Sequence, residues 1–306
     1  MTADPKHSRL TPIALALAGL LLSAPLAPAE ERSVPAASEK PANAAETASE
    51  KTKAKAEKLR RTNRAAWKAL APGLEFAAVE VVFEAEEADR IALYRFDPAR
   101  FRLTQHHDYD APTVSKWRER LGAVLVINAG FFLKADDKRG IKWGAPATPL
   151  LIDGARMGPK RYHAKHGVLL FGPRAADAPQ VAFRDFGGKA TRVRLRRFGY
   201  DNAVVSYPTL IDFDGKVRAG GTGARSKRTF IGIDKAGRVL IGVTRERSFS
   251  LPELGEYLRE LPGLDAAYVL NLDGGVRSAI AASIGEHGYE DDNGYELPLV
   301  IAVVPR

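Results

Sequence analysis

A carboxylate and two glycines at the end of an apolar run carry the clearest chemical signal in the sequence. Residues 266–270 are apolar and favour a buried strand, and Asp273, Gly274 and Gly275 follow shortly afterwards. A strand that ends in this way brings a carboxylate to the rim of a sheet, where glycine permits a sharp turn and the close approach of a ligand. An ordinary strand-to-turn junction explains the same pattern, because Asp-Gly is a common turn signal.

A second polar strand end lies earlier in the chain. Residues 124–127 are apolar and lead into Asn128, Gly130, Phe131 and Phe132. The Asn128 amide can both donate and accept hydrogen bonds, and paired aromatic rings either form a wall for a sugar or pack the core. Two such strand ends, far apart in sequence, can meet at one edge of a sheet.

A third segment combines glycines with cations. Residues 220–229 contain three glycines, Arg225, Lys227 and Arg228, and they lead into the apolar run 230–234. Backbone N–H groups and guanidinium groups both bind anions, so this composition suits phosphate. The spacing matches neither a nucleotide P-loop nor a dinucleotide-binding motif. A basic loop before a hairpin is the alternative interpretation.

Together the three segments resemble the phosphodiester glycosidase family. The family has an Asn-Ala-Gly-Phe-Phe-like motif, an Arg-Thr-x-Ile-Gly motif and a Leu-Asp-Gly-Gly-Gly-Ser-Ser-like motif, which correspond here to residues 128–132, 228–232 and 272–278. The resemblance covers residues 75–304 in the same order and spacing. It implies an exported hydrolase that cleaves the glycosidic bond of a sugar-1-phosphodiester in an envelope or extracellular glycan.

The chain departs from the family pattern at two places. Val276 and Arg277 stand where the family commonly has glycine and serine, and Glu296 is followed by Leu297 instead of arginine. Because valine disfavours positive φ, the loop here is expected to follow a different path from the common one.

The resemblance also implies roles for individual residues. A developing oxocarbenium ion requires a nearby carboxylate, and a departing phosphate requires cations or N–H donors. The expected catalytic residues are Asp273, Glu296, Asn128 and Arg228, and the expected substrate-binding residues are Thr229, Gly130, Phe131, Gly274, Gly275 and Ser278. If Arg228 faces Asp273, its positive charge should lower the pKa of the carboxyl and keep it ionised at neutral pH.

Two other functions are compatible with the same residues. One is a non-catalytic carbohydrate-binding protein of the cell envelope, and the other is a phosphodiesterase that cleaves the P–O bond. The expected partner is a phosphorylated glycan, without nucleic acid and without a cofactor. A divalent cation such as calcium is compatible with the acidic turn 291–294, but neither this turn nor the histidines at 106–107 and 163–166 match a metal signature.

The N-terminal region predicts export. Residues 1–29 combine basic residues, a short apolar run and an Ala-Pro-Ala cleavage site, as in a signal peptide, so a periplasmic or secreted protein without a further transmembrane segment is expected. Residues 30–66 are rich in Ala, Glu, Lys, Ser and Thr and predict a disordered tether, and residues 67–306 form the expected glycosidase-like domain. The chain has no cysteine, so the domain must be stable without disulfides. The net charge of the whole chain, +9, suits weak contact with anionic envelope polymers.

The remaining pattern is dominated by strands. Short helices are expected at 113–121 and from the capping box Ser250–Glu253 onward. Strands are expected at 75–83, 91–96, 149–153, 167–171, 181–184, 191–197, 203–212, 229–234, 239–244 and 297–304, with hairpin turns at 153–154 and 214–215. Since no βαβ alternation occurs, the predicted fold class is α+β, with largely antiparallel sheets and a few short helices in a single domain.

Overall fold

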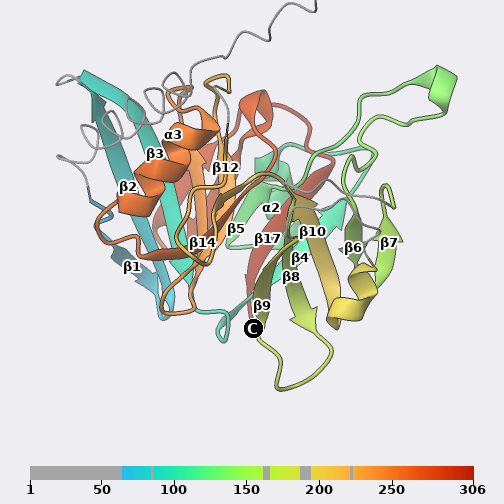
Figure 1. The fold of residues 1–306 in the computed structure, drawn as a ribbon, viewed down its shortest axis with the longest axis horizontal. Helices are drawn as coiled ribbons and strands as arrows, with labels where there is room; N and C mark the ends of the chain where they lie inside the picture. The colour runs from blue at the N-terminus through green and yellow to red at the C-terminus, as the bar shows by residue number, and fades with distance from the viewer. Residues whose placement is uncertain (1–63, 84–85, 161–165, 187–193, 221–222) are drawn as a thin grey trace, which may run out of the picture. The chain divides into compact units, whose positions relative to one another are not determined.

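A computed structural model describes residues 64–306, with the exception of 84–85, 161–165, 187–193 and 221–222. This part of the chain forms three antiparallel sheets and two α-helices (Figure 1). The predicted signal peptide and nearly all of the predicted tether lie outside the described residues, as does His163. Neither described helix has the length and apolarity that a membrane span requires.

Sheet I has seven strands. Their spatial order is β1 (Lys68–Ala71), β2 (Leu74–Phe83), β3 (Glu86–Phe96), β13 (Val239–Thr244), β12 (Thr229–Asp234), β14 (Ala266–Asn271) and β11 (Thr209–Ile211). Strands β12 and β14 are antiparallel neighbours, with Phe230 opposite Asn271. Because of this register, the N-terminal end of β12 and the C-terminal end of β14 lie at the same edge of the sheet.

Sheets II and III have five strands each. Sheet II is ordered β7 (Ala155–Met157), β6 (Leu150–Ile152), β10 (Tyr200–Ser206), β8 (Gly167–Pro173) and β9 (Val181–Asp185). Sheet III is ordered β16 (His287–Asp291), β15 (Ile280–Ile284), β5 (Leu125–Asn128), β17 (Leu299–Pro305) and β4 (Phe101–His107). Strand β5 is therefore central in sheet III, and its last residue is Asn128.

Both helices pack on outer faces of the sheets. Helix α3 (Leu251–Glu260) begins with the predicted capping box between Ser250 and Glu253, and its buried residues join the cluster on one face of sheet I. Helix α2 (Val114–Leu121) places Val114 and Trp117 in the cluster on sheet III. Short 3-10 helices η1 (Asp137–Arg139), η2 (Leu195–Phe198) and η3 (Gly275–Arg277) lie in the loops.

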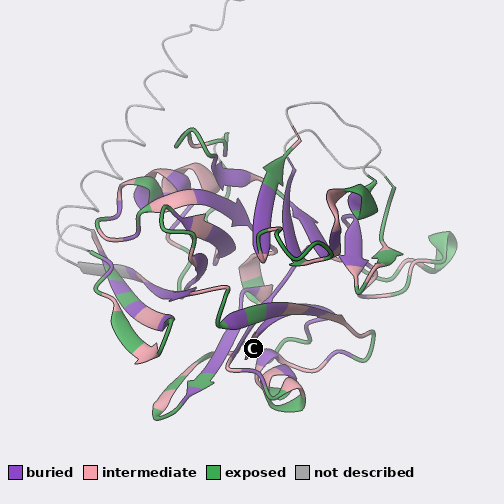
Figure 2. Ribbon diagram, turned by 90° about the horizontal axis from the view of Figure 1, so that it is seen from below, coloured by how far each residue is buried: buried purple, intermediate pink, exposed green. Residues whose placement is uncertain are grey.

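One apolar cluster joins the three sheets. It contains Tyr94 of sheet I, Phe171 of sheet II and Ile127 of sheet III, all almost fully buried. Figure 2 shows that the strands are mostly buried and that exposed residues gather in loops and at strand ends. Because the same core contacts all three sheets, the loops between the sheets are held at fixed positions.

Most of the predicted strands are confirmed, as is the antiparallel pairing, but three expectations need correction. Helices contribute so little that the fold is closer to all-β than to α+β. The described part of the predicted strand 191–197 is instead the start of η2, which ends at the left-handed Gly199. The predicted strand 203–212 is divided into β10 and β11 by the cis bond between Tyr207 and Pro208, because proline cannot donate to the strand ladder.

The packing of β12 against β14 can be tested at Gly232. A Cβ at this position would lie 2.2 Å from the Tyr268 carbonyl oxygen of β14. We expect Gly232→Ala to lower the free energy of unfolding by about 1–3 kcal/mol, as overpacking of a core does. Gly288→Ala in β16 is the control, because a Cβ there meets no atom within 4 Å. Urea denaturation of both variants measures the difference, and equal losses would contradict the proposed close packing.

Candidate active site

The candidate site is the segment in which the chain crosses from sheet I to sheet III. Residues 272–279 join β14 to β15 and contain η3. On the side of sheet I, Leu272 N donates to Thr229 O at 2.8 Å, and on the side of sheet III, Asp273 N donates to Ala129 O at 3.0 Å. The crossing segment is therefore held by backbone hydrogen bonds from both sheets.

The Asn128 side chain reinforces this connection. Its Nδ2 donates to Asp273 O at 2.7 Å, while its Oδ1 accepts from Thr229 Oγ1 at 2.7 Å and from Ala279 N at 3.1 Å. Asn128 is only 2% exposed. The sequence led us to expect that Asn128 contacts substrate, but the structure gives its amide to protein partners that fix the position of Asp273.

Asp273 is the carboxylate that the crossing segment presents. Burial raises the pKa of Asp273 to about 6, against the opposing effects of the Gly274 N–H and of Arg277. Gly274 N donates to Asp273 Oδ1 at 2.8 Å, and the carboxylate forms no ion pair with any described lysine or arginine. A carboxyl with a raised pKa in a partly exposed position is typical of functional sites.

The expected effect of Arg228 on this carboxyl is wrong in direction. The pKa of Asp273 is raised instead of lowered because burial outweighs the nearby charges, and the cation that opposes burial is Arg277. A pKa of about 6 still leaves the carboxyl mostly ionised at pH 7. Arg228 lies beside the loop, since a Cβ at Gly274 would be 3.7 Å from Arg228 Nη1.

Arg228 keeps its charge without a carboxylate partner in the described part of the chain. One terminal nitrogen donates to the Ala224 carbonyl at 2.5 Å, and Nε is buried without a hydrogen-bond partner among the described residues. Burial lowers the pKa of the Arg228 guanidinium, but arginine remains protonated in proteins. The neighbouring Lys227, by contrast, is paired with Asp291 at 2.8 Å.

The glycines shape the loop instead of offering free donors. A Cβ added at Gly274 would lie 3.1 Å from Lys227 O, and Gly275 has a φ of +71°. The expectation that their N–H groups bind phosphate is not met, because Gly274 N donates to Asp273 and Gly275 N donates to Lys227 O at 2.9 Å. Val276 lies in η3 without a positive φ, so the loop accommodates the valine.

Of three further predicted residues, two are too buried for substrate contact and one is exposed. Thr229 and Ser278 are fully buried, and Ser278 Oγ has no hydrogen-bond partner among the described residues. Thr229 supports the crossing segment through Asn128, and Ser278 is a buried residue within that segment. Glu296 is exposed, and its backbone carbonyl accepts a hydrogen bond from Arg277, so the chain passes close to the site there although no contact joins its carboxylate to Asp273.

A stack of aromatic rings joins the predicted Phe131 to Tyr207, which the sequence analysis did not select. Phe131 stacks on Tyr207 with ring centroids 4.6 Å apart, and His166 stacks on the same tyrosine at 4.8 Å. Tyr207 is 41% exposed, and its carbonyl accepts from Asn271 Nδ2. The Tyr207 backbone is thus bonded to Asn271, which precedes Asp273 by two residues. Gly130, which precedes the stack, is buried against Val204 and Thr148. The sequence feature that could have indicated Tyr207 is the Tyr-Pro pair between two apolar runs.

A second aromatic group surrounds Arg277. Its guanidinium carbon lies 5.0 Å from the Phe132 ring centre, 5.9 Å from that of Trp143 and 5.3 Å from that of Tyr295. The sequence analysis treated Arg277 only as a departure from the family. The structure makes it the charged residue that acts most directly on Asp273.

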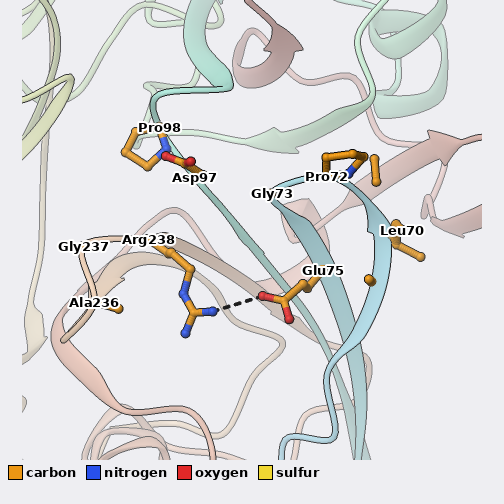
Figure 3. Close-up of a pocket in the computed structure, with 11 residues that line it drawn as sticks. Leu70, Pro72, Gly73, Glu75, Asp97, Pro98, Ala236, Gly237 and Arg238 are labelled. Atoms are coloured by element: carbon orange, nitrogen blue, oxygen red, sulfur yellow. Dashed lines mark hydrogen bonds and ion pairs between the residues drawn. The ribbon is translucent and has the colours of Figure 1, made fainter.

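A large surface cavity lies away from this site. It has a volume of about 890 Å³ and is lined by residues that include Glu75, Asp97 and Arg238 (Figure 3). The cavity lies at the β12–β13 turn, which is at the opposite end of β12 from Thr229. Glu75 is paired there with Arg95 at 2.6 Å and with Arg238 at 3.1 Å. These charges neutralise one another, so the cavity offers less chemistry than the crossing segment.

The described residues contain no group of three side chains arranged to hold a metal ion. The adjacent histidines of β4 make separate contacts, His106 with Thr104 and His107 with the Gly144 carbonyl. The candidate site itself contains Asp273, Arg277 with the aromatic rings around it, and Arg228.

Comparison with known proteins defines the class to which this site belongs. Residues 121–304 match the phosphodiester glycosidase family, a family of hydrolases, and this span includes Asn128, Arg228 and the whole crossing segment. The match covers more than half of the chain, and the protein belongs to the phosphodiester glycosidase family. No curated protein sequence matches the chain.

Solved structures show the same fold. The catalytic domain of zebrafish N-acetylglucosamine-1-phosphodiester alpha-N-acetylglucosaminidase, auto-inhibited by its pro-peptide, aligns with a TM-score of 0.56 and 13% identity over 80% of this chain and 88% of that chain. A hypothetical protein from Synechocystis aligns with a TM-score of 0.53 and 14% identity over 77% of this chain. The present chain spans 63% of the length of that protein. At such identities the likeness concerns the fold.

The structural role of Asn128 predicts a large loss of stability on truncation. Asn128→Ala removes the partners of Thr229 Oγ1, Ala279 N and Asp273 O, which are left without hydrogen bonds beside the core. We expect the free energy of unfolding to fall by about 2–4 kcal/mol. Asn293→Ala is the control, because this exposed amide bonds the carbonyls of Val276 and Ser278 and water can replace it. Guanidinium denaturation compares the two, and a loss below about 1 kcal/mol for Asn128→Ala would contradict the role.

The raised pKa of Asp273 predicts how stability depends on pH. The folded value of about 6 exceeds the ordinary value of 3.8, so the folded state binds more protons than the unfolded state between these limits. The contribution of Asp273 is therefore most favourable below about pH 4 and is lost as the pH rises through 6, by roughly 1–3 kcal/mol. Asp273→Asn should lack this decline and should be more stable than the wild type at pH 7. Denaturation of both proteins between pH 4 and 7.5, with carbon NMR titration of the carboxyl, measures it; an apparent pKa below 4 would refute the expected shift.

Proposed function

We propose that the protein hydrolyses the glycosidic bond of a sugar-1-phosphodiester, with Asp273 as the catalytic carboxylate. The observation that carries this proposal is the position of Asp273, whose partly exposed carboxylate has a pKa of about 6 and is acted on by the charge of Arg277, while Arg228 lies against the neighbouring Gly274. Membership of a hydrolase family whose members act on phosphodiester-linked glycans supports the reaction class.

In the proposed reaction, water attacks the anomeric carbon and the C–O bond to phosphate breaks. The bonding electrons leave with the phosphate oxygen, and the products are a free sugar and a phosphate monoester. A carboxylate with a pKa of about 6 is ionised at neutral pH and can accept the proton that the attacking water loses. Its charge also stabilises the oxocarbenium-like transition state.

Arg228 supplies positive charge for the departing phosphate. The guanidinium lies against Gly274 and has no carboxylate partner among the described residues, so its charge is available to a ligand. Charge-assisted hydrogen bonds from arginine to phosphate are among the stronger ones in proteins. A phosphate is a good leaving group once its charge is stabilised, so a strong general acid is less necessary than for an alkyl glycoside.

The Phe131–Tyr207 stack is the proposed wall for the sugar ring. Tyr207 is exposed and its carbonyl is bonded to Asn271, and the stacked rings offer an apolar face to a sugar. Glu296 is proposed as a second carboxylate that reaches the substrate from the opposite loop. Asn128 and Thr229 hold the crossing segment in place, and Ser278 is a buried residue within it.

We also propose that the protein acts in the periplasm or outside the cell. The support is the signal-peptide pattern of residues 1–29 and the Ala-Pro-Ala site that ends it. A phosphodiester-linked glycan of the cell envelope or of the surroundings fits this location.

Hydrolysis by Asp273 can be tested with a panel of sugar-1-phosphodiesters in ¹⁸O-labelled water. We expect turnover by the wild type with the label in the sugar, and a loss of at least about 1,000-fold in kcat for Asp273→Asn, since about 4 kcal/mol of transition-state stabilisation corresponds to that factor. Asp201→Asn is the control, because this exposed carboxylate pairs with Arg174 on sheet II.

Each other outcome selects a different function. Label in the phosphate product would identify a phosphodiesterase that cleaves the P–O bond. Glycan binding without any turnover would identify a carbohydrate-binding protein. Near-wild-type turnover by a folded Asp273→Asn variant would remove Asp273 from the mechanism.

A further inference from the structure

Among the arginines that the structure describes, Arg277 has three aromatic rings around its guanidinium, whereas Arg95 and Arg120 each lie over one. Its guanidinium lies among the rings of Phe132, Trp143 and Tyr295, at 5.0, 5.9 and 5.3 Å from their centres. Phe132 and Trp143 meet edge to face with centroids 5.8 Å apart, and one terminal nitrogen of Arg277 donates to the Glu296 carbonyl. Rings from two separate loops thus fix a flexible side chain in one place.

The positive charge at Arg277 is not neutralised within the described part of the chain. No carboxylate forms an ion pair with it, and its single hydrogen bond there uses one of five N–H donors. Arg120 provides a contrast, since it also lies over a tryptophan, at 5.1 Å from the Trp117 ring, but is paired with Asp108 at 2.7 Å. Cation–π contacts hold the Arg277 guanidinium while leaving its donors available.

Arg277 and Arg228 reach the segment around Asp273 and Gly274 from different elements. Arg277 follows Asp273 in η3 and acts on its carboxyl through space, and Arg228 precedes β12 and lies against Gly274. The two guanidinium groups match the two proposed carboxylates, Asp273 and Glu296. A phosphodiester adds one negative charge, and serine at position 277 would remove one of the two cations that can meet this charge.

We propose that Arg277 is a specificity-determining residue that binds the phosphate group of the substrate, and that Phe132, Trp143 and Tyr295 hold it in position. This inference rests on the proposed function for the identity of the substrate, but phosphate binding itself does not require turnover. The site thereby prefers sugars with an anionic phosphate at the anomeric oxygen over neutral glycosides of the same sugar.

Binding of inorganic phosphate and of dimethyl phosphate, measured by titration calorimetry, is the first test. We expect Arg277→Ser to raise the Kd of both probes by about 10–100-fold, the range of one charge-assisted hydrogen bond. Arg277→Lys should retain part of the affinity, because the charge remains but the planar guanidinium is lost. Arg120→Ser is the matched control, which removes an arginine over a tryptophan outside the site and should leave both Kd values unchanged.

Substrate selectivity is the second test. We expect Arg277→Ser to lower kcat/KM for a sugar-1-phosphodiester at least about tenfold more than for the neutral nitrophenyl glycoside of the same sugar, which a general loss of structure would not do. Should Arg277→Ser fail to fold, Arg277→Gln keeps a donor for the Glu296 carbonyl and serves in the same comparison.

The outcomes separate this inference from the proposed function. A Kd within twofold of the wild type for a folded Arg277→Ser variant overturns the inference, as does a wild-type protein that binds neither probe. If the wild type binds phosphate through Arg277 but hydrolyses no phosphodiester, the proposed function fails while the anion site stands.

Discussion

The hydrogen bonds of the Asn128 amide are the interaction on which the site depends. At this point the chain leaves sheet I and enters sheet III, and a single buried side chain bonds groups from both sheets and from the segment between them. A buried amide whose oxygen and nitrogen are both hydrogen-bonded resists small displacements, because a shift leaves polar groups unpaired beside the core. The Asp273 backbone is therefore fixed, and the directions open to its carboxylate are few.

The same burial that fixes the segment also sets its electrostatics. Desolvation disfavours a charged carboxylate, whereas the N–H of Gly274 and the charge of Arg277 favour it, and at Asp273 desolvation is the largest effect. The result is a carboxyl that changes protonation near pH 6 and is mostly ionised at pH 7. Such a group can accept a proton during a reaction, which a strongly ion-paired aspartate does much less readily.

The departures from the family pattern are accommodated locally. Val276 requires no unusual backbone angle, because the left-handed turn of the loop falls on Gly275. Arg277 is longer than the serine that commonly stands there, and the space it takes is bounded by Phe132, Trp143 and Tyr295. The three rings and the arginine form one packed unit, so this position adds a charge to the site without disturbing the crossing segment.

The sequence by itself determined the antiparallel strands, the capped helix α3, the motifs and the family. These features depend on local alternation of apolar and polar residues and on short patterns such as the residues around Asp273. Such patterns can be recognised without knowing which residues are in contact. The strand expected at 191–197 failed because alternating charges do not fix a strand without a neighbour to pair with, and the residues from 195 onward form η2 instead.

Only the tertiary structure decided which of the predicted site residues remain accessible and which are buried. Asn128, Thr229 and Ser278 have polar side chains, as Asp273 has. Nothing in the local sequence distinguishes a residue that contacts substrate from a buried residue that supports the site. The direction of the Asp273 pKa shift was likewise undetermined, because desolvation depends on every atom packed around the carboxyl. The partners of Arg277 lie between 18 and 145 residues away along the chain, counted from Tyr295 and Phe132, so only folding brings its charge, its aromatic support and the carboxylate together.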